Sequence, residues 1–103
     1  MIYKLTEKNK FGGHTYQIKL DSIFHIFINE TNANSYSVDF KEWKWFNYKL
    51  HFSFISNGDL KETVRQTFEK TYDFFSRNSD YAWTREQMTN KLNQTLEIVD
   101  MLK

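Results

Sequence analysis

The sequence predicts an α+β fold: an antiparallel five-stranded meander sheet followed by two C-terminal helices packed as a hairpin on one face of the sheet. Apolar and polar residues alternate with a period of two up to about residue 56, and beyond Asn57-Gly58 the period becomes 3.6. The connections between segments are short, which favours pairing of strands that follow one another in the chain. Strands first and helices afterwards are typical of the α+β class.

Length and composition limit the classes of protein to consider. The 103 residues, 40% apolar and 18% aromatic, suffice for one domain spanning residues 1–103 with a real core. Without cysteine the chain forms no disulfide and no thiolate metal site. Without an apolar signal core or a long apolar run, we expect a cytoplasmic protein that does not enter a membrane. A net charge of +1 excludes an acidic mimic of nucleic acid and a strongly basic binder of it.

The expected strands have bounds that follow the alternation. They cover about 2–7, 14–20, 23–30, 35–43 and 46–55. The Gly12-Gly13 pair supplies the turn after the first strand, since glycine adopts positive φ at little cost.

The fourth and fifth strands, residues 35–56, form the longest alternating run in the chain. Even positions of the fifth strand carry the apolar side chains, which predicts that they face the core; these residues are Phe46, Tyr48, Leu50, Phe52 and Phe54. The alternation breaks where charges occupy the even positions Glu42 and Lys44. A break without Gly or Pro indicates a bulge or a hairpin turn near residues 41–45, which would place Trp43 and Trp45 at an edge or a tip.

Capping signals define two helices, expected at about 59–77 and 84–102. Asp59 precedes Glu62 by three residues and Thr84 precedes Gln87 by three, the spacing of a capping box. Each pair is followed by an apolar stripe at helical spacing. The stripes predict that the helices cover the even-numbered, aromatic face of the sheet.

No catalytic motif is present in the sequence, and we expect neither enzymatic activity, nor a cofactor, nor a bound metal. The alternation places His25, His51 and Asp39 on the sheet face away from the helices, where such a cluster could bind a metal or transfer protons. Ordinary polar residues on a solvated face are the favoured interpretation. Carboxylates at helical spacing, such as Glu69 and Asp73, are interpreted as solvated helix faces with basic partners.

The odd-numbered face of the sheet carries aromatic rings among lysines, a pattern found in proteins that bind single-stranded nucleic acid. The candidate nucleic-acid-binding residues are Lys19, Lys41, Trp43, Lys49 and His51. The absence of arginine before residue 65 and of a concentrated basic patch counts against this function. It is therefore the alternative prediction.

The favoured prediction is a small non-enzymatic module that binds a protein, because tryptophan beside mixed charges is typical of interface anchors. The candidate interface residues are Trp43, Trp45, Lys41, Lys44 and Phe27. Phe46, Tyr81 and Trp83 are further aromatic residues not clearly assigned to the core, although Trp83 could instead pack at the start of the second helix. Packing of Trp43 and Trp45 in the core is the alternative for those two residues. Small size and an AT-rich coding bias suggest an accessory or inhibitor protein of a phage or mobile element, directed at a host defence protein. A homodimer through an edge strand is a further expectation.

Overall fold

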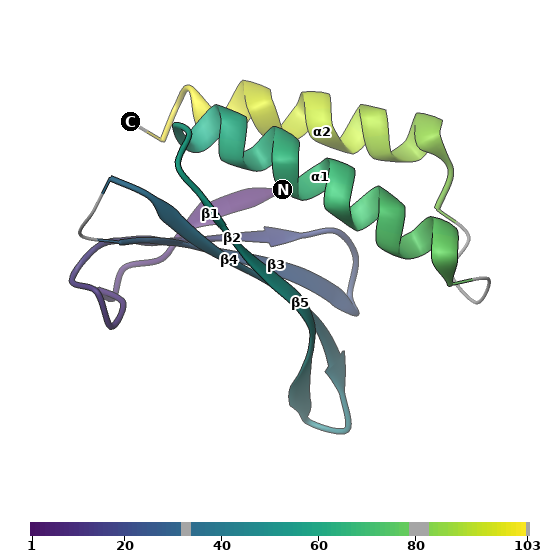
Figure 1. Ribbon diagram of the computed structural model, residues 1–103, viewed down its shortest axis with the longest axis horizontal. Helices are drawn as coiled ribbons and strands as arrows, with labels where there is room; N and C mark the ends of the chain where they lie inside the picture. Colours follow the sequence, from purple (N-terminus) through teal and green to yellow (C-terminus); the bar gives the residue numbers. More distant parts are fainter. Residues whose placement is uncertain (32–33, 79–82, 103) are drawn as a thin grey trace.

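The computed structural model describes residues 1–31, 34–78 and 83–102, and it has the predicted α+β architecture. A five-stranded antiparallel sheet in the order β1-β2-β3-β4-β5 forms one layer, and two helices form the other (Figure 1). The strands are β1 (Ile2–Lys4), β2 (Thr15–Lys19), β3 (Phe24–Glu30), β4 (Tyr36–Lys44) and β5 (Asn47–Ser56). The helices are α1 (Leu60–Arg77) and α2 (Arg85–Val99). Neither helix has an apolar stretch long enough to cross a membrane, within the described part of the chain.

The order and type of all seven elements were predicted correctly, and the bounds differ only at the ends. β1 ends three residues earlier than expected, at Lys4, and α2 ends at Val99 although the apolar stripe continues to Leu102. In the loop after β1, the Asn9 side chain accepts hydrogen bonds from the Phe11 and Gly13 amides. Gly12 has a φ of 82°, which explains the glycine at that position.

The core lies between the helices and one face of β2, β3 and β4. Its side chains come from the even positions, as the alternation predicts, and α1 lies over β4 while α2 lies over β1. The fully buried members on the sheet include Ile18, Ile26, Ile28, Val38 and Phe40. The Phe40 ring is central, because it contacts Phe24 at 5.6 Å and Phe75 of α1 at 5.9 Å between ring centroids.

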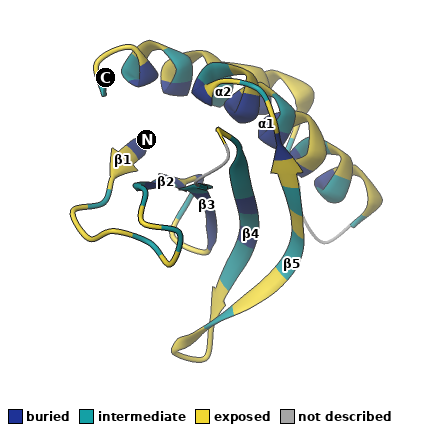
Figure 2. Ribbon diagram, turned by 60° about the vertical axis from the view of Figure 1, so that its left-hand side comes forward, coloured by how far each residue is buried: buried dark blue, intermediate teal, exposed yellow. Residues whose placement is uncertain are grey.

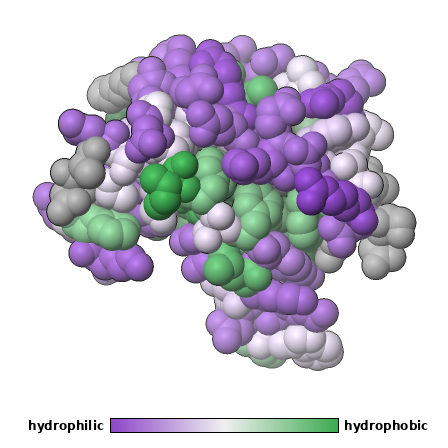
Figure 3. Space-filling view, viewed as in Figure 1, coloured by the Kyte–Doolittle hydropathy of each residue, from purple (hydrophilic) through white to green (hydrophobic). Residues whose placement is uncertain are grey.

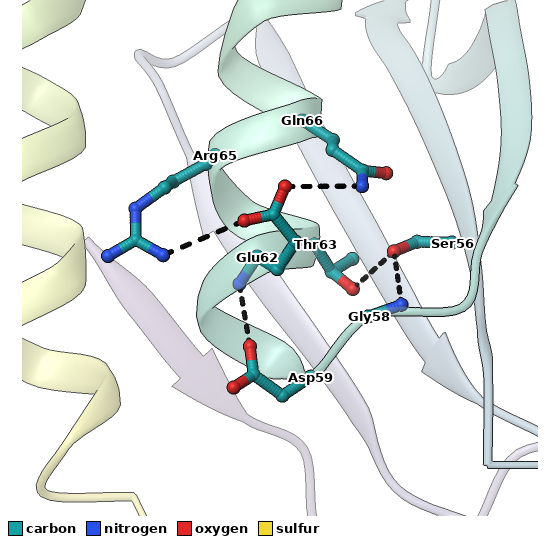
Figure 4. A network of polar contacts seen from close by, with 7 residues as sticks. All are labelled: Ser56, Gly58, Asp59, Glu62, Thr63, Arg65 and Gln66. Atoms are coloured by element: carbon teal, nitrogen blue, oxygen red, sulfur yellow. Dashed lines mark hydrogen bonds and ion pairs between the residues drawn. The ribbon is translucent and has the colours of Figure 1, made fainter.

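Local chemistry starts each helix where the sequence indicates. The Asp59 carboxylate accepts a hydrogen bond from the Glu62 amide at 2.8 Å, and the Glu62 side chain in turn contacts Arg65 and Gln66 (Figure 4). At α2 the capping box is complete, with Thr84 and Gln87 each bonded to the backbone of the other. These caps satisfy amides that have no partner within the helix.

The buried face of α1 also carries three threonines, Thr63, Thr67 and Thr71. The hydroxyls of Thr67 and Thr71 donate to the carbonyls four residues earlier, and the Thr63 hydroxyl donates to Ser56 Oγ at 2.8 Å. Because each hydroxyl has a partner, α1 can approach the sheet closely without burying an unsatisfied polar group.

Candidate functional site

The β4–β5 hairpin extends beyond the two layers, away from the helices (Figures 1 and 2). β4 keeps an uninterrupted register with β3 from Phe24↔Glu42 to Glu30↔Tyr36. The predicted bulge or hairpin turn near residues 41–45 is confirmed, because the register of β4 with β5 shifts between Phe40 and Lys41 and the chain turns at Trp45-Phe46. Glu42 and Lys44 stay on the same face as Phe40, where Glu42 is partly buried and Lys44 is exposed.

The extra residue at this register shift belongs to β5. Phe40 pairs with Phe52 but Lys41 pairs with Leu50, so His51 is an extra residue in β5, a β-bulge. One extra residue moves every side chain before it to the opposite face of the sheet. Tyr48 and Leu50 consequently lie on the face away from the helices, here called the open face, and Lys49 lies on the helix side with Glu42.

Several predicted positions in β5 are corrected by this bulge. Phe46 and Leu50, expected in the core, are 94% and 53% exposed. Of the expected core residues of β5, only Phe52 and Phe54 pack against the core. Lys49 and His51, expected on the open face, lie on the other face.

His51 packs on the helix side of the sheet, against Phe74 at 4.8 Å between ring centroids. Its Nε2 lies 2.7 Å from Glu42 Oε1, and both side chains are largely buried. His25 stays on the open face, opposite Lys41. The sheet therefore separates the two histidines of the proposed His25–His51–Asp39 cluster, and the described residues contain no group of three acidic, histidine or cysteine side chains placed to hold a metal.

Tyr48 organises the open face at the base of the hairpin. Its hydroxyl forms a 2.8 Å hydrogen bond with His25 Nδ1, and its ring makes edge-on contacts with Phe27 at 5.3 Å and Trp43 at 4.9 Å. The Lys41 ammonium lies 5.2 Å from the centre of the Phe27 ring and 5.9 Å from that of Tyr48. This group of five side chains, here called the Tyr48 cluster, stiffens the hairpin where it leaves the two-layer part of the molecule.

Tyr48 also changes the environment of His25. Although His25 is on the open face, it is only 8% exposed. Burial, followed by the charge of Lys19, lowers the pKa of His25 below its ordinary value, against a smaller opposite effect of Asp21. This environment favours the neutral form of His25, whose Nδ1 is hydrogen-bonded to the Tyr48 hydroxyl.

The tip of the hairpin is a two-residue turn, Trp45-Phe46, enclosed by the pair Lys44↔Asn47. Both turn residues have positive φ, 54° and 60°, as the tight type I′ hairpin turn requires. Such turns normally contain Asn-Gly, because left-handed backbone costs a residue with a Cβ roughly 1–2 kcal/mol. Trp45 is 84% exposed, and the Phe46 ring is almost entirely in solvent.

The predicted interface residues thus occupy two connected places. Lys41, Trp43 and Phe27 belong to the Tyr48 cluster, while Lys44 and Trp45 are at the tip. Phe46 is not among the five predicted interface residues, because its even position in the alternation favoured the core. The bulge that invalidates this assignment leaves no sign in an unbroken alternating run.

The remaining candidates have structural roles or lie elsewhere. Trp83 packs on the core, with its ring stacked on Phe75 at 5.7 Å, so it is not part of a free surface. Tyr81 lies outside the described residues. Glu69 pairs with Arg85 at 3.0 Å and Asp100 with Lys61 at 2.8 Å, which agrees with solvated helix faces.

Comparison of the chain with protein-family models, with curated proteins and with solved structures found no match.

Proposed function

We propose that the protein binds another protein through the tip of the β4–β5 hairpin, Lys44–Asn47. The observation that carries this proposal is the Trp45-Phe46 turn, where two large aromatic residues combine left-handed backbone with nearly complete exposure. The turn destabilises the isolated fold in two ways. Its residues have left-handed backbone, and their apolar side chains are exposed to water. Strained backbone of this kind is concentrated at binding and active sites.

The chemistry of the tip suits a protein partner. Tryptophan and other aromatic residues are the commonest anchors of protein interfaces, where they enter pockets and lose their water. Lys44, also exposed, lies directly before the turn. An aromatic pair beside a positive charge is best accommodated by an apolar pocket with an acidic rim.

The Tyr48 cluster supports the proposal from the base of the hairpin. Trp43 and Tyr48 form a cross-strand aromatic pair two steps from the turn, and Tyr48 is tied to His25 of β3. A hairpin fixed in this way presents Trp45 and Phe46 with little further ordering on binding, which lowers the entropic cost of association.

Single-stranded nucleic acid is the less favoured ligand. Of the residues proposed for it, only Lys19, Lys41 and Trp43 share the open face. The Lys41 ammonium lies over the rings of Phe27 and Tyr48, where a base would have to stack. The proposed role as a phage or mobile-element inhibitor of a host defence protein depends on size and composition, and it specifies which partners to test first.

The experiment replaces the turn by the residues that favour it, Trp45→Asn with Phe46→Gly. Because Asn-Gly relieves the left-handed strain, we expect the free energy of unfolding in denaturant titrations to rise by roughly 1–3 kcal/mol. The same variant should bind a partner protein at least ~30-fold more weakly, since losing one aromatic anchor costs about 2 kcal/mol or more. Stability and binding would thus change in opposite directions.

The partner is identified by affinity capture from lysate of cells carrying the gene, then purified and titrated calorimetrically with wild type and variants. Met101→Ala is the matched control, because it removes an exposed apolar side chain beyond the end of α2 and should leave affinity unchanged. A turn variant with wild-type affinity would refute the tip as the binding site. Oligonucleotide binding that is strongly weakened by salt and by Lys41→Glu would favour the nucleic-acid alternative.

A further inference from the structure

The outer strand β5 is a long open edge of the sheet. It has ten residues, whereas β1 at the opposite edge has three. α1 packs mainly over β4 and reaches β5 through side chains such as Lys70 and Phe74, which leaves the backbone edge of β5 open. An open edge of this length is a template for pairing with another strand.

The register shows which backbone groups of β5 point outward. The Trp43 amide donates to Ile23 O, so odd residues of β4 bond toward β3 and even residues bond toward β5. Phe52 and Phe54 face the even residues Phe40 and Val38 and therefore bond inward. Ser53, between them, and Ile55 direct their N–H and C=O groups away from the sheet.

Both sides of this edge carry apolar side chains. On the helix side, Phe52, Phe54 and Phe74 line a groove of about 410 Å³ between β5 and α1, whose other lining residues are polar or charged, Lys70, Asp73 and Arg77 among them. On the open face, Leu50 and Ile55 are 53% and 61% exposed. Figure 3 shows the resulting apolar band across the middle of the molecule, between the polar surface of the helices and the hairpin.

We propose that a second copy of this chain covers the edge, through antiparallel pairing of β5 with β5 of its partner about a two-fold axis at Ser53. This register places Phe52 of each copy opposite Phe54 of the other, so that the phenylalanines of the two grooves lie side by side. Ser53 would exchange both backbone hydrogen bonds with its counterpart, the arrangement that an isologous interface requires.

The charges of Lys70 and Asp73 favour the axis at Ser53 over an axis at Phe54. α1 runs back along β5, with the Lys70 ammonium 5.0 Å from the centre of the Phe54 ring and Phe74 beside Phe52 at 6.2 Å. Asp73, which precedes Phe74, also lines the groove. An axis at Phe54 would bring the two Lys70 ammonium groups together, whereas an axis at Ser53 brings Lys70 of each copy toward Asp73 of the other.

The dimer would carry two binding tips. Because the paired strands are antiparallel, the two hairpins leave the common sheet at opposite ends. Six residues separate Ser53 from Asn47, which puts the tips up to ~40 Å apart at about 3.3 Å per residue. A partner with two copies of the epitope would then be bound bivalently.

The test is the mass of the full chain by analytical ultracentrifugation between about 10 and 500 µM. The wild type should approach twice 12.6 kDa as concentration rises. Ser53→Pro removes an outward N–H without removing a bond to β4, so it should stay folded by circular dichroism and sediment as a monomer. Ser53→Thr keeps the N–H and is the matched control, expected to dimerise.

A second set of variants tests the register on the exposed surface of α1. Asp73→Lys should weaken dimerisation by placing like charges together, and adding Lys70→Glu to it should restore dimerisation by exchanging the two signs. Failure of this rescue would overturn the axis at Ser53. A wild-type monomer at every concentration, or a Ser53→Pro variant that dimerises normally, would overturn the pairing of copies and leave the edge to an extended segment of another protein. The Asn-Gly turn variant should dimerise like the wild type, which separates this test from that of the hairpin tip.

Discussion

At the scale of single residues, the open face is organised around Tyr48 and His25. The pair couples β5 to β3 across β4, and it is possible only because the bulge at His51 turns Tyr48 away from the helices. The same bulge places His51 against Glu42 and Phe74. One inserted residue thus creates two histidine contacts, one on each face of the sheet.

The lowered pKa of His25 predicts how stability depends on pH. Since the neutral form is favoured in the folded state, the unfolded chain binds the proton more readily as pH falls through its ordinary value of about 6.5. The contribution of His25 is therefore fully present above that value and is lost between it and the lower folded-state pKa. Denaturant midpoints measured from pH 8 to 5 should fall for the wild type.

His25→Gln keeps a polar side chain but does not titrate, and it should reduce this fall. If wild type and variant lost stability in parallel across the same pH range, the titration of His25 would not contribute. Acidic residues on other elements affect both proteins equally, so the difference between the two curves isolates the histidine.

At the scale of elements, the helices depend on their caps and the hairpin depends on its partners. The polar contacts that start α1 and α2 are made by residues only three positions apart in the sequence. The hairpin instead combines an unfavourable turn with a cluster contributed by three strands. Its conformation therefore depends on tertiary contacts rather than on local preference.

Thr84→Ala should reduce the free energy of unfolding by about 1 kcal/mol, because it removes the acceptor for the Gln87 amide and breaks the capping box. Thr84→Ser retains the hydroxyl and should stay close to the wild type. Denaturant titration at constant pH measures both. If both variants lost the same free energy of unfolding, packing of the threonine methyl group would explain the effect, and the hydroxyl would not.

At the scale of the whole molecule, helices cover β1 to β4 over part of their length, and the hairpin continues alone. The buried residues are concentrated in β2, β3, the first half of β4 and one face of each helix (Figure 2). The molecule thus has a well-packed two-layer part and a β4–β5 hairpin that extends from it and is held by the Tyr48 cluster. This division predicts different local stabilities.

Amide hydrogen exchange should show this division. The slowest exchange is expected in β3, which is paired on both sides, and the fastest among strand amides in residues 43–48 of the hairpin. Protection at Ser53 and Ile55 should rise with protein concentration if β5 pairs with a second copy. Uniform protection along β4 would contradict the division between the two parts.

The sequence alone determined the number, order and type of the elements, the helix starts, and the core face of the strands up to Phe40. These features follow from local chemistry, namely period-two alternation, period-3.6 stripes and capping pairs, all of which lie within a few residues of one another. The fold could be predicted for that reason. The break in alternation also drew attention to Trp43 and to two residues of the hairpin tip, Lys44 and Trp45.

Only the tertiary structure decided the face of each residue from Phe46 to His51. A bulge depends on how one strand pairs with its neighbour, and an aromatic-polar alternation looks the same on either side of it. The tertiary structure also decided that Glu42 lies beside His51 whereas Lys44 is exposed, which no local pattern records. Phe46 therefore moved from the expected core to the tip, and with Trp45 it forms the strained, exposed turn on which the proposed function depends.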